Sequence, residues 1–187
     1  MLPILSIIVF ILLFVGYSLY VSVIREKNAV EEAFSGIDVQ LTKRHDLIPN
    51  IVATAQKFME HEKGLLEEIT QLRTNAIQAA QGKDLEKTIA TENTLGTKLG
   101  QLMVSVENYP TLKRDNTMLE VQKSLQDVEE HLAASRRFYN SAVRQLNDSI
   151  QVWPMSMIAA WLKIKAYPYF EATEASRAVP NVDKMFS

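Results

Sequence analysis

The sequence contains no cysteine, which excludes disulfides, thiolate metal sites and a cysteine nucleophile. Histidine is also scarce. His45, His61 and His131 are the only three, and no two of them are spaced as neighbours on one helix face. The His61-Glu62 pair lacks the second histidine of an H-E-x-x-H zinc motif. We therefore expect no metal ion and no cofactor.

Glycine and proline number only six each. No Walker loop, G-x-G-x-x-G loop or G-x-S-x-G turn occurs, although a Ser-His-Asp arrangement built from distant positions would leave no such trace. The glycines of "LGTKLG" (Leu95 to Gly100) fall on a helical stripe, which favours close helix packing over phosphate binding. The sequence thus indicates that the protein is not an enzyme.

A large charge of either sign is missing too: the net charge is -2 and the pI is about 6.0. Such a balance gives no indication of a nucleic-acid-binding surface. Few glycines and prolines, abundant Leu, Ala, Gln, Glu and Lys, and no sustained alternation of polar and apolar residues predict an all-α protein.

The most distinctive stretch is Leu2-Ile24, in which no side chain is charged. As a helix it would extend about 34 Å, enough to cross a bilayer. A cleaved signal peptide would have a basic start, a shorter apolar run and a pair of small residues at its end, and this stretch has none of them. We predict that residues 1-24 form a transmembrane anchor and that residues 25-187 form the domain that it holds.

The charges next to the span bear on orientation. Arg25 and Lys27 follow it at once, whereas its other side carries only the terminal amine. The positive-inside rule favours a cytoplasmic domain in a single-pass protein of the bacterial inner membrane. Glu26, Glu31 and Glu32 weaken this bias.

Apolar residues recur at steps of three and four after the span. They are Phe34, Ile37, Leu41, then Arg44, then Ile48, Ile51, Ala55 and Phe58. This heptad pattern resumes at Leu65 and predicts one helix over residues 25-81, about 85 Å long. Gly82 is its candidate C-cap.

Two further long helices are expected, over residues 85-107 and from Thr117 to about Trp153. Pro110 separates them, and Thr117 with Glu120 has the spacing of a capping box. Pro154 can begin a short fourth helix, which a C-terminal tail follows. The predicted architecture is an N-terminal transmembrane helix, a long antiparallel three-helix bundle, the short fourth helix and the tail.

Several polar residues interrupt or border the apolar stripes. A lone buried charge costs several kcal/mol, roughly, so these residues should pair across helices. The predicted network consists of Arg44, Asp46, Glu107, Glu129, Arg136, Tyr139, Asn140 and Asn147. Arg44 lies on the seam, whereas His45 and Asp46 fall off it. A network of this kind can fix helix register or form a ligand or catalytic site, and the first interpretation is favoured.

Pro49 lies within the first predicted helix. Its ring removes a backbone hydrogen bond and crowds the carbonyl of His45, so we expect a kink or bulge. The freed carbonyl needs a donor, for which Arg44 and Asn50 are candidates.

Four segments resemble the bacterial LemA family. They are "GIDVQLTKRHDLIPNIVATAQKFMEHEKGLLEEITQLRTNA" (Gly36 to Ala76), "ENYPTLK" (Glu107 to Lys113), "LQDVEEHLAASRRFYNSAVRQLN" (Leu125 to Asn147), and the tail elements "YFEA" and "VPNV". The resemblance covers nearly the whole chain. It implies an N-terminal membrane helix and an antiparallel helical bundle, without an assigned biochemical activity. Magnetosome-associated relatives suggest a role at membranes. The apolar segment "MSMIAAWL" after Pro154 departs from the family pattern, and it could pack on the bundle, another copy or the membrane.

Two functions follow as hypotheses. The first is a membrane-anchored helical scaffold or adaptor that holds a protein partner, or copies of itself, at the bilayer through Leu2-Ile24. The alternative is a ligand sensor or enzyme that uses the buried Arg/Glu cluster. The lack of a catalytic constellation favours the scaffold.

Overall fold

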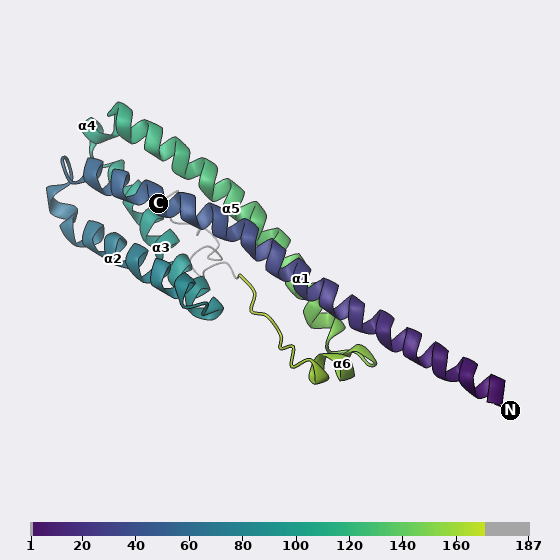
Figure 1. Ribbon diagram of the computed structural model, residues 1–187. Coiled ribbons are helices and arrows are strands. Elements are labelled where there is room, and N and C mark those ends of the chain that lie inside the picture. The colour runs from purple at the N-terminus through teal and green to yellow at the C-terminus, as the bar shows by residue number, and fades with distance from the viewer. Residues whose placement is uncertain (1, 171–187) are drawn as a thin grey trace, which may run out of the picture. The chain divides into compact units, whose positions relative to one another are not determined.

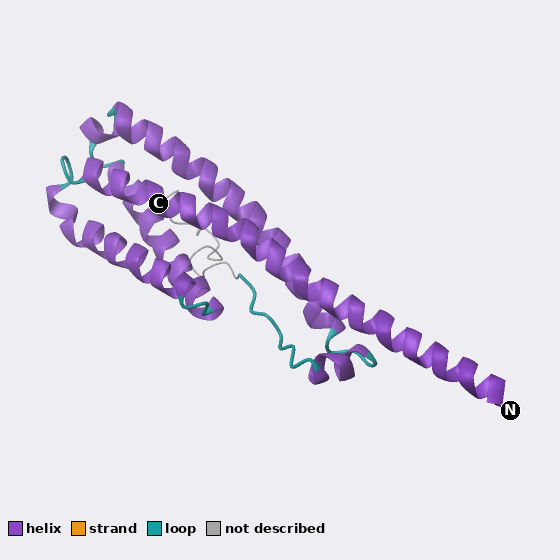
Figure 2. Ribbon diagram, viewed as in Figure 1, coloured by secondary structure: helices purple, strands orange, loops and turns teal. Residues whose placement is uncertain are grey.

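The structure is a computed structural model that describes residues 2-170 (Figure 1). Within this range every regular element is a helix and no strand occurs, which confirms the all-α prediction (Figure 2). The elements are α1 (Leu2-Ala55), the 3-10 turn η1 (Glu60-Glu62), α2 (Lys63-Gln81), α3 (Leu85-Val106), α4 (Pro110-Lys113), α5 (Asn116-Ser149) and α6 (Met155-Trp161). The predicted tail elements after Phe170 lie outside the described residues.

The single helix predicted over residues 25-81 is wrong. α1 ends at Ala55, and α2 is a separate helix that runs back in the other direction (Figure 1). The last turn tightens as Lys57 N donates to Thr54 O, while Met59 N donates to Ala55 O. Met59 is fully buried in the connection. The burial of this side chain stabilises a turn that lacks both glycine and proline.

The helix ends follow the sequence closely, with one correction. Gly82 is the C-cap of α2, as predicted, and Asp84 accepts a hydrogen bond from Lys87 N as the N-cap of α3. At the start of α5, Asp115 accepts from Met118 N at 3.0 Å. The cap is therefore Asp115 rather than Thr117, because a carboxylate three residues before a free N-H is an effective N-cap.

The described chain divides into two compact units. Unit 1 contains residues 2-44 and 125-169, and unit 2 contains residues 45-124 with Phe170. α1 and α5 each contribute residues to both units.

In unit 1, α1 and α5 pack antiparallel. The rings of Phe34 and Tyr139 meet edge to face with their centroids 5.8 Å apart. The core of unit 1 consists of Val23, Val30, Ala33, Ile37, Leu41, Leu125, Val128, Leu132, Tyr139, Val143, Leu146 and Ala159. These residues recur at steps of three, four or seven along each helix, so each helix buries one stripe.

The first part of α1 is apolar and exposed. Its most apolar 18-residue window has a mean hydropathy of 2.6, and 6% of that window is buried. By length and composition this helix could cross a membrane. Its exposure distinguishes it from the core helix of a soluble protein.

Unit 2 is built around α2 and α3, which lie beside the last part of α1. Its apolar core includes Ile48, Ile51, Leu66, Ile69, Leu95, Leu99, Leu102 and Val106. This packing positions the polar groups described next.

Candidate functional site

Arg44 and Glu129 form an ion pair within unit 1. Arg44 Nη2 lies 2.5 Å from Glu129 Oε2, and the side chain of Arg44 is 1% exposed whereas that of Glu129 is 41% exposed. The structure thus contains this part of the predicted network. The pair joins α1 to α5, and water screens it on the glutamate side.

Tyr139 and Asn147, two further predicted residues of α5, bind the chain beyond α6 rather than the network. Tyr139 is fully buried and its hydroxyl donates to Pro168 O at 2.9 Å. Burial, and next the nearby Tyr167, raise the pKa of Tyr139. Asn147 Nδ2 donates to Tyr167 O at 3.0 Å, and Tyr167 N donates to Asn147 Oδ1 at 2.9 Å. Tyr139 and Asn147 therefore bind the backbone of residues 167-168. Arg136 and Asn140 are half-buried on the same helix.

Asp46 and Glu107 were predicted to belong to the network, and both are exposed. Asp46 follows Arg44 by two positions, which turns its side chain about 200° around the helix. Glu107 is the C-cap of α3 and forms its ion pair with Lys113 at the surface. The prediction that these two residues belong to a buried network is therefore wrong.

His45 forms a second pair that the sequence did not reveal. His45 Nε2 lies 2.7 Å from Glu92 Oε1, and the two side chains are 10% and 1% exposed. His45 does lie off the seam of Arg44, turned about 100° from it, but it is buried against α3 rather than exposed. Glu92 stands three residues from both Ile89 and Leu95, which are buried. That spacing was the available signal.

The backbone carbonyl of His45 has a donor from α2. Arg73 Nε donates to His45 O at 2.7 Å. Proline at position 49 has no N-H to offer this carbonyl, and α1 nevertheless continues through Pro49 to Ala55. The expected donors, Arg44 and Asn50, were thus wrong, and the kink at Pro49 stays a prediction. His45 binds α3 through its side chain and α2 through its carbonyl.

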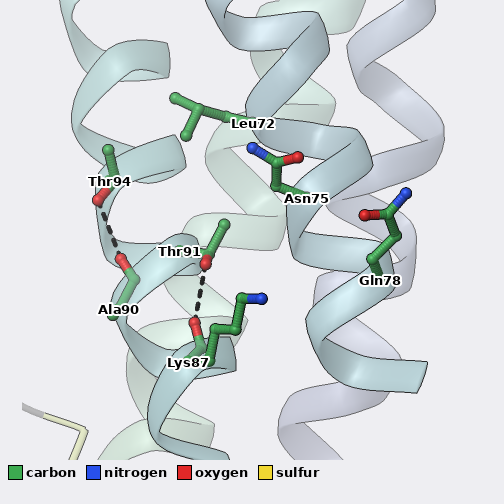
Figure 3. Close-up of a pocket in the computed structure, with 7 residues that line it drawn as sticks. All are labelled: Leu72, Asn75, Gln78, Lys87, Ala90, Thr91 and Thr94. Carbon is green, nitrogen blue, oxygen red and sulfur yellow. Dashed lines mark hydrogen bonds between the residues drawn. The ribbon is translucent and has the colours of Figure 1, made fainter. Parts of the chain in front are cut away.

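An open groove of about 380 Å³ lies between α2 and α3 (Figure 3). The residues that line it are Leu72, Asn75, Gln78, Lys87, Ala90, Thr91 and Thr94. The hydroxyls of Thr91 and Thr94 donate to carbonyls of their own helix, Lys87 O and Ala90 O. Neither His45 nor Glu92 lines this groove, so the buried pair and the groove are separate features.

In the part of the chain that the structure describes, no group of three His, Asp or Glu side chains is arranged to hold a metal ion. The polar contacts instead connect helices, through Arg44-Glu129 in unit 1 and through His45 with its two partners in unit 2.

Fold and contacts together define an all-helical protein with one helix long and apolar enough to cross a membrane, and its polar side chains join its helices. The chain belongs to the LemA family, whose model matches residues 33-183.

Curated relatives agree with this assignment. The magnetosome protein MamQ 2 of Paramagnetospirillum magneticum is 24% identical, and the match covers 92% of this chain and 71% of the relative. MamQ of Magnetospirillum gryphiswaldense gives the same identity and coverage. The protein LemA of Metamycoplasma hominis is 25% identical over 91% of this chain and 80% of its own length. These matches include most of the chain outside the family model.

Proposed function

We propose that the protein is a membrane-anchored scaffold or adaptor that organises partners, or copies of itself, at the bilayer. Leu2-Ile24 crosses the membrane once, and the domain lies in the cytoplasm. The observation that carries this proposal is the continuity of α1 from Leu2 to Ala55. A helix without a linker holds Arg44 about 30 Å beyond Ile24, at 1.5 Å per residue.

The exposed apolar end of α1 supports the anchor. Every residue from Ile4 to Phe14 except Ser6 has a large apolar side chain, and each of these ten is at least 47% exposed. Exposed apolar surface of this extent is rare in a soluble protein and lipid would cover it.

The polar contacts support a structural role for the rest of the chain. Arg44 and His45 contact side chains of other helices, and Asn147 binds the backbone of Tyr167. Such contacts fix helix register. That some relatives are named magnetosome proteins supports a role in organising a cellular structure.

A ligand sensor or enzyme is the second candidate, and the buried His45-Glu92 pair is the observation in its favour. A histidine beside a carboxylate is a combination that acid-base catalysis uses. A ligand that protects this pair, or a phenotype lost in Glu92→Gln without loss of helix content, would support this alternative.

Cross-linking in intact membranes tests the scaffold. A photoreactive amino acid at Val39, which is 53% exposed in unit 1, should give specific cross-linked species that mass spectrometry can identify. The same amino acid at Ile37, which is fully buried, serves as the matched control and should give only intramolecular products. A chain that yields no specific partner and no oligomer from exposed positions would contradict the proposal. A topology reporter fused after Ser187 tests the cytoplasmic orientation separately.

A further inference from the structure

The segment around α6 exposes large apolar side chains. Trp153, Met157 and Trp161 are 74%, 64% and 76% exposed, and Val152 is 64% exposed. Met157 and Trp161 are four residues apart on α6, the spacing that puts side chains on one side of a helix, and Trp153 lies in the turn just before that helix. Contiguous exposed apolar surface of this kind marks an interaction site.

The register of α1 and α5 in unit 1 shows which part of α1 lies beside the start of this segment. Ten residues separate Arg44 from Phe34 on α1, and ten separate their partners Glu129 and Tyr139 on α5. Continuing this antiparallel register brings the end of α5 opposite Val23, which is fully buried. α5 therefore ends where the charge-free span of α1 ends, and α6 follows that end (Figure 1).

The chain returns to the same level after α6. Asn147 binds the backbone of Tyr167, and the Tyr167 hydroxyl donates to Glu31 Oε1 at 3.5 Å. Residues 151-166 thus form a loop that contains α6. Both of its ends lie against the α1-α5 pair, within the first two turns of α1 after the span. Within residues 151-166 only Ala159 is buried.

The chemistry of the segment fits a lipid headgroup region. No Asp or Glu occurs from Ile150 to Phe170, while Lys163 and Lys165 are exposed. Tryptophan and tyrosine concentrate at the membrane-water interface, and Tyr20 of the anchor is 38% exposed at this level. Lysine beside such a segment attracts anionic lipid.

We propose that residues 151-166 are a second membrane contact, which lies in the interface of the leaflet from which the anchor emerges. Trp153, Met157 and Trp161 enter the boundary between headgroups and acyl chains, and Lys163 and Lys165 contact anionic headgroups. This proposal rests on the proposed anchoring of α1. The bilayer, rather than a second copy of the chain, covers these side chains, because they lie at the end of α1's charge-free span, which itself requires lipid.

Tryptophan fluorescence tests the contact directly, because Trp153 and Trp161 are the only two tryptophans in the chain. The full chain is reconstituted in phosphatidylcholine-phosphatidylglycerol vesicles that contain lipids brominated either near the headgroup or near the bilayer centre. We expect blue-shifted emission, strong quenching by the shallow bromines, weaker quenching by the deep ones, and protection from aqueous acrylamide. The variants W153F and W161F assign the signal to each remaining tryptophan.

A matched pair of variants locates the effect. M157K should shift the emission to the red and increase acrylamide quenching, because a charge would lift the segment from the interface. F138K changes a side chain of nearly the same exposure, 65% against 64% for Met157. Phe138 lies on α5 about 16 Å beyond the span, so this variant should leave the emission unchanged. If M157K alters the helix content, the quenching of the unmodified chain still decides the question.

Three outcomes have distinct meanings. If the chain does not float with the vesicles, the proposed anchoring of α1 is itself wrong. A chain that floats while acrylamide quenches both tryptophans and bromine does not would overturn the α6 contact but not the anchor. Protection from both quenchers would also overturn it, since it indicates that protein rather than lipid covers the segment.

Discussion

Two adjacent residues of α1 connect to different units of the molecule. Arg44 pairs with Glu129 of α5 in unit 1, and the carboxylate of that pair is 41% exposed. His45 pairs with Glu92 of α3 in unit 2, and that carboxylate is 1% exposed. The difference teaches that one helical turn can supply both a solvent-screened and a buried polar contact, and the two should respond differently to mutation and salt.

The largest effect is expected for the dry pair. Glu92→Ala should lower the free energy of unfolding by about 3 kcal/mol, because it leaves the buried imidazole of His45 without this partner. Urea unfolding of the full chain in detergent, followed by far-UV circular dichroism, measures the change. Glu68→Ala is the control in the same unit, since Glu68 pairs with Lys98 and is 46% exposed, and it should cost about 0.5 kcal/mol or less. Equal losses of unfolding free energy for Glu92→Ala and Glu68→Ala would contradict the claim that the buried pair contributes more than an exposed one.

The second prediction concerns the carbonyl of His45. Arg73→Met should cost about 1.5 kcal/mol, because the carbonyl loses its donor. Pro49→Ala supplies a backbone N-H in its place, so Arg73→Met should cost less in that background. The double-mutant cycle measures this coupling, with Arg114→Met as the exposed control. A cost that is the same with Pro49 and with alanine would show that the two positions are independent.

Tyr139 sharpens the description of unit 1. Tyr139→Phe should cost about 1 kcal/mol near neutral pH, through loss of the hydrogen bond to Pro168. Burial raises the pKa of Tyr139 above its ordinary value of 10.0, so the neutral hydroxyl stabilises the folded state. Its contribution is fully present below pH 10.0 and is lost as pH rises towards the folded-state pKa.

The measurement is the urea midpoint as a function of pH. The unmodified chain should lose stability above pH 10.0 more steeply than Tyr139→Phe. Parallel curves for the two proteins would contradict a buried, protonated tyrosine.

The smallest effect is expected for the screened pair. Glu129→Gln should cost less than about 1 kcal/mol, because water already shares the carboxylate. Added salt should reduce the difference between the two proteins, whereas it should leave the effect of Glu92→Ala nearly unchanged. A salt-independent loss as large as that of Glu92→Ala would show that Arg44 and Glu129 form a dry pair after all.

Sequence periodicity placed Arg44 and Glu129 on facing stripes, and the structure pairs them. Tyr139 and Asn147 lie on or beside the same stripe of α5, but they bind the backbone of residues 167-168, which no helical spacing indicates. Glu92 lies on the apolar stripe between Ile89 and Leu95 and was not among the predicted network residues. Spacing also gives no information on which helix a polar residue faces, so the partners of His45 required the structure.

The break after α1 could not be predicted from spacing. Phe58 and Leu65 are separated by one heptad, so the pattern keeps its phase across a turn and looks the same as a continuous helix. No glycine or proline marks residues 56-62. The helix ends where Met59 is buried in the core. The spacing of apolar residues carries no information on this tertiary contact.

The hydrogen bond from Arg73 to His45 has a consequence for synthesis on the ribosome. The carbonyl beneath Pro49 finds its protein donor 28 residues further along the chain. The last two turns of α1 gain this contact only after α2 has been made and has turned back. During synthesis the residues of α1 therefore precede the donor of its final turns by about one helix of chain.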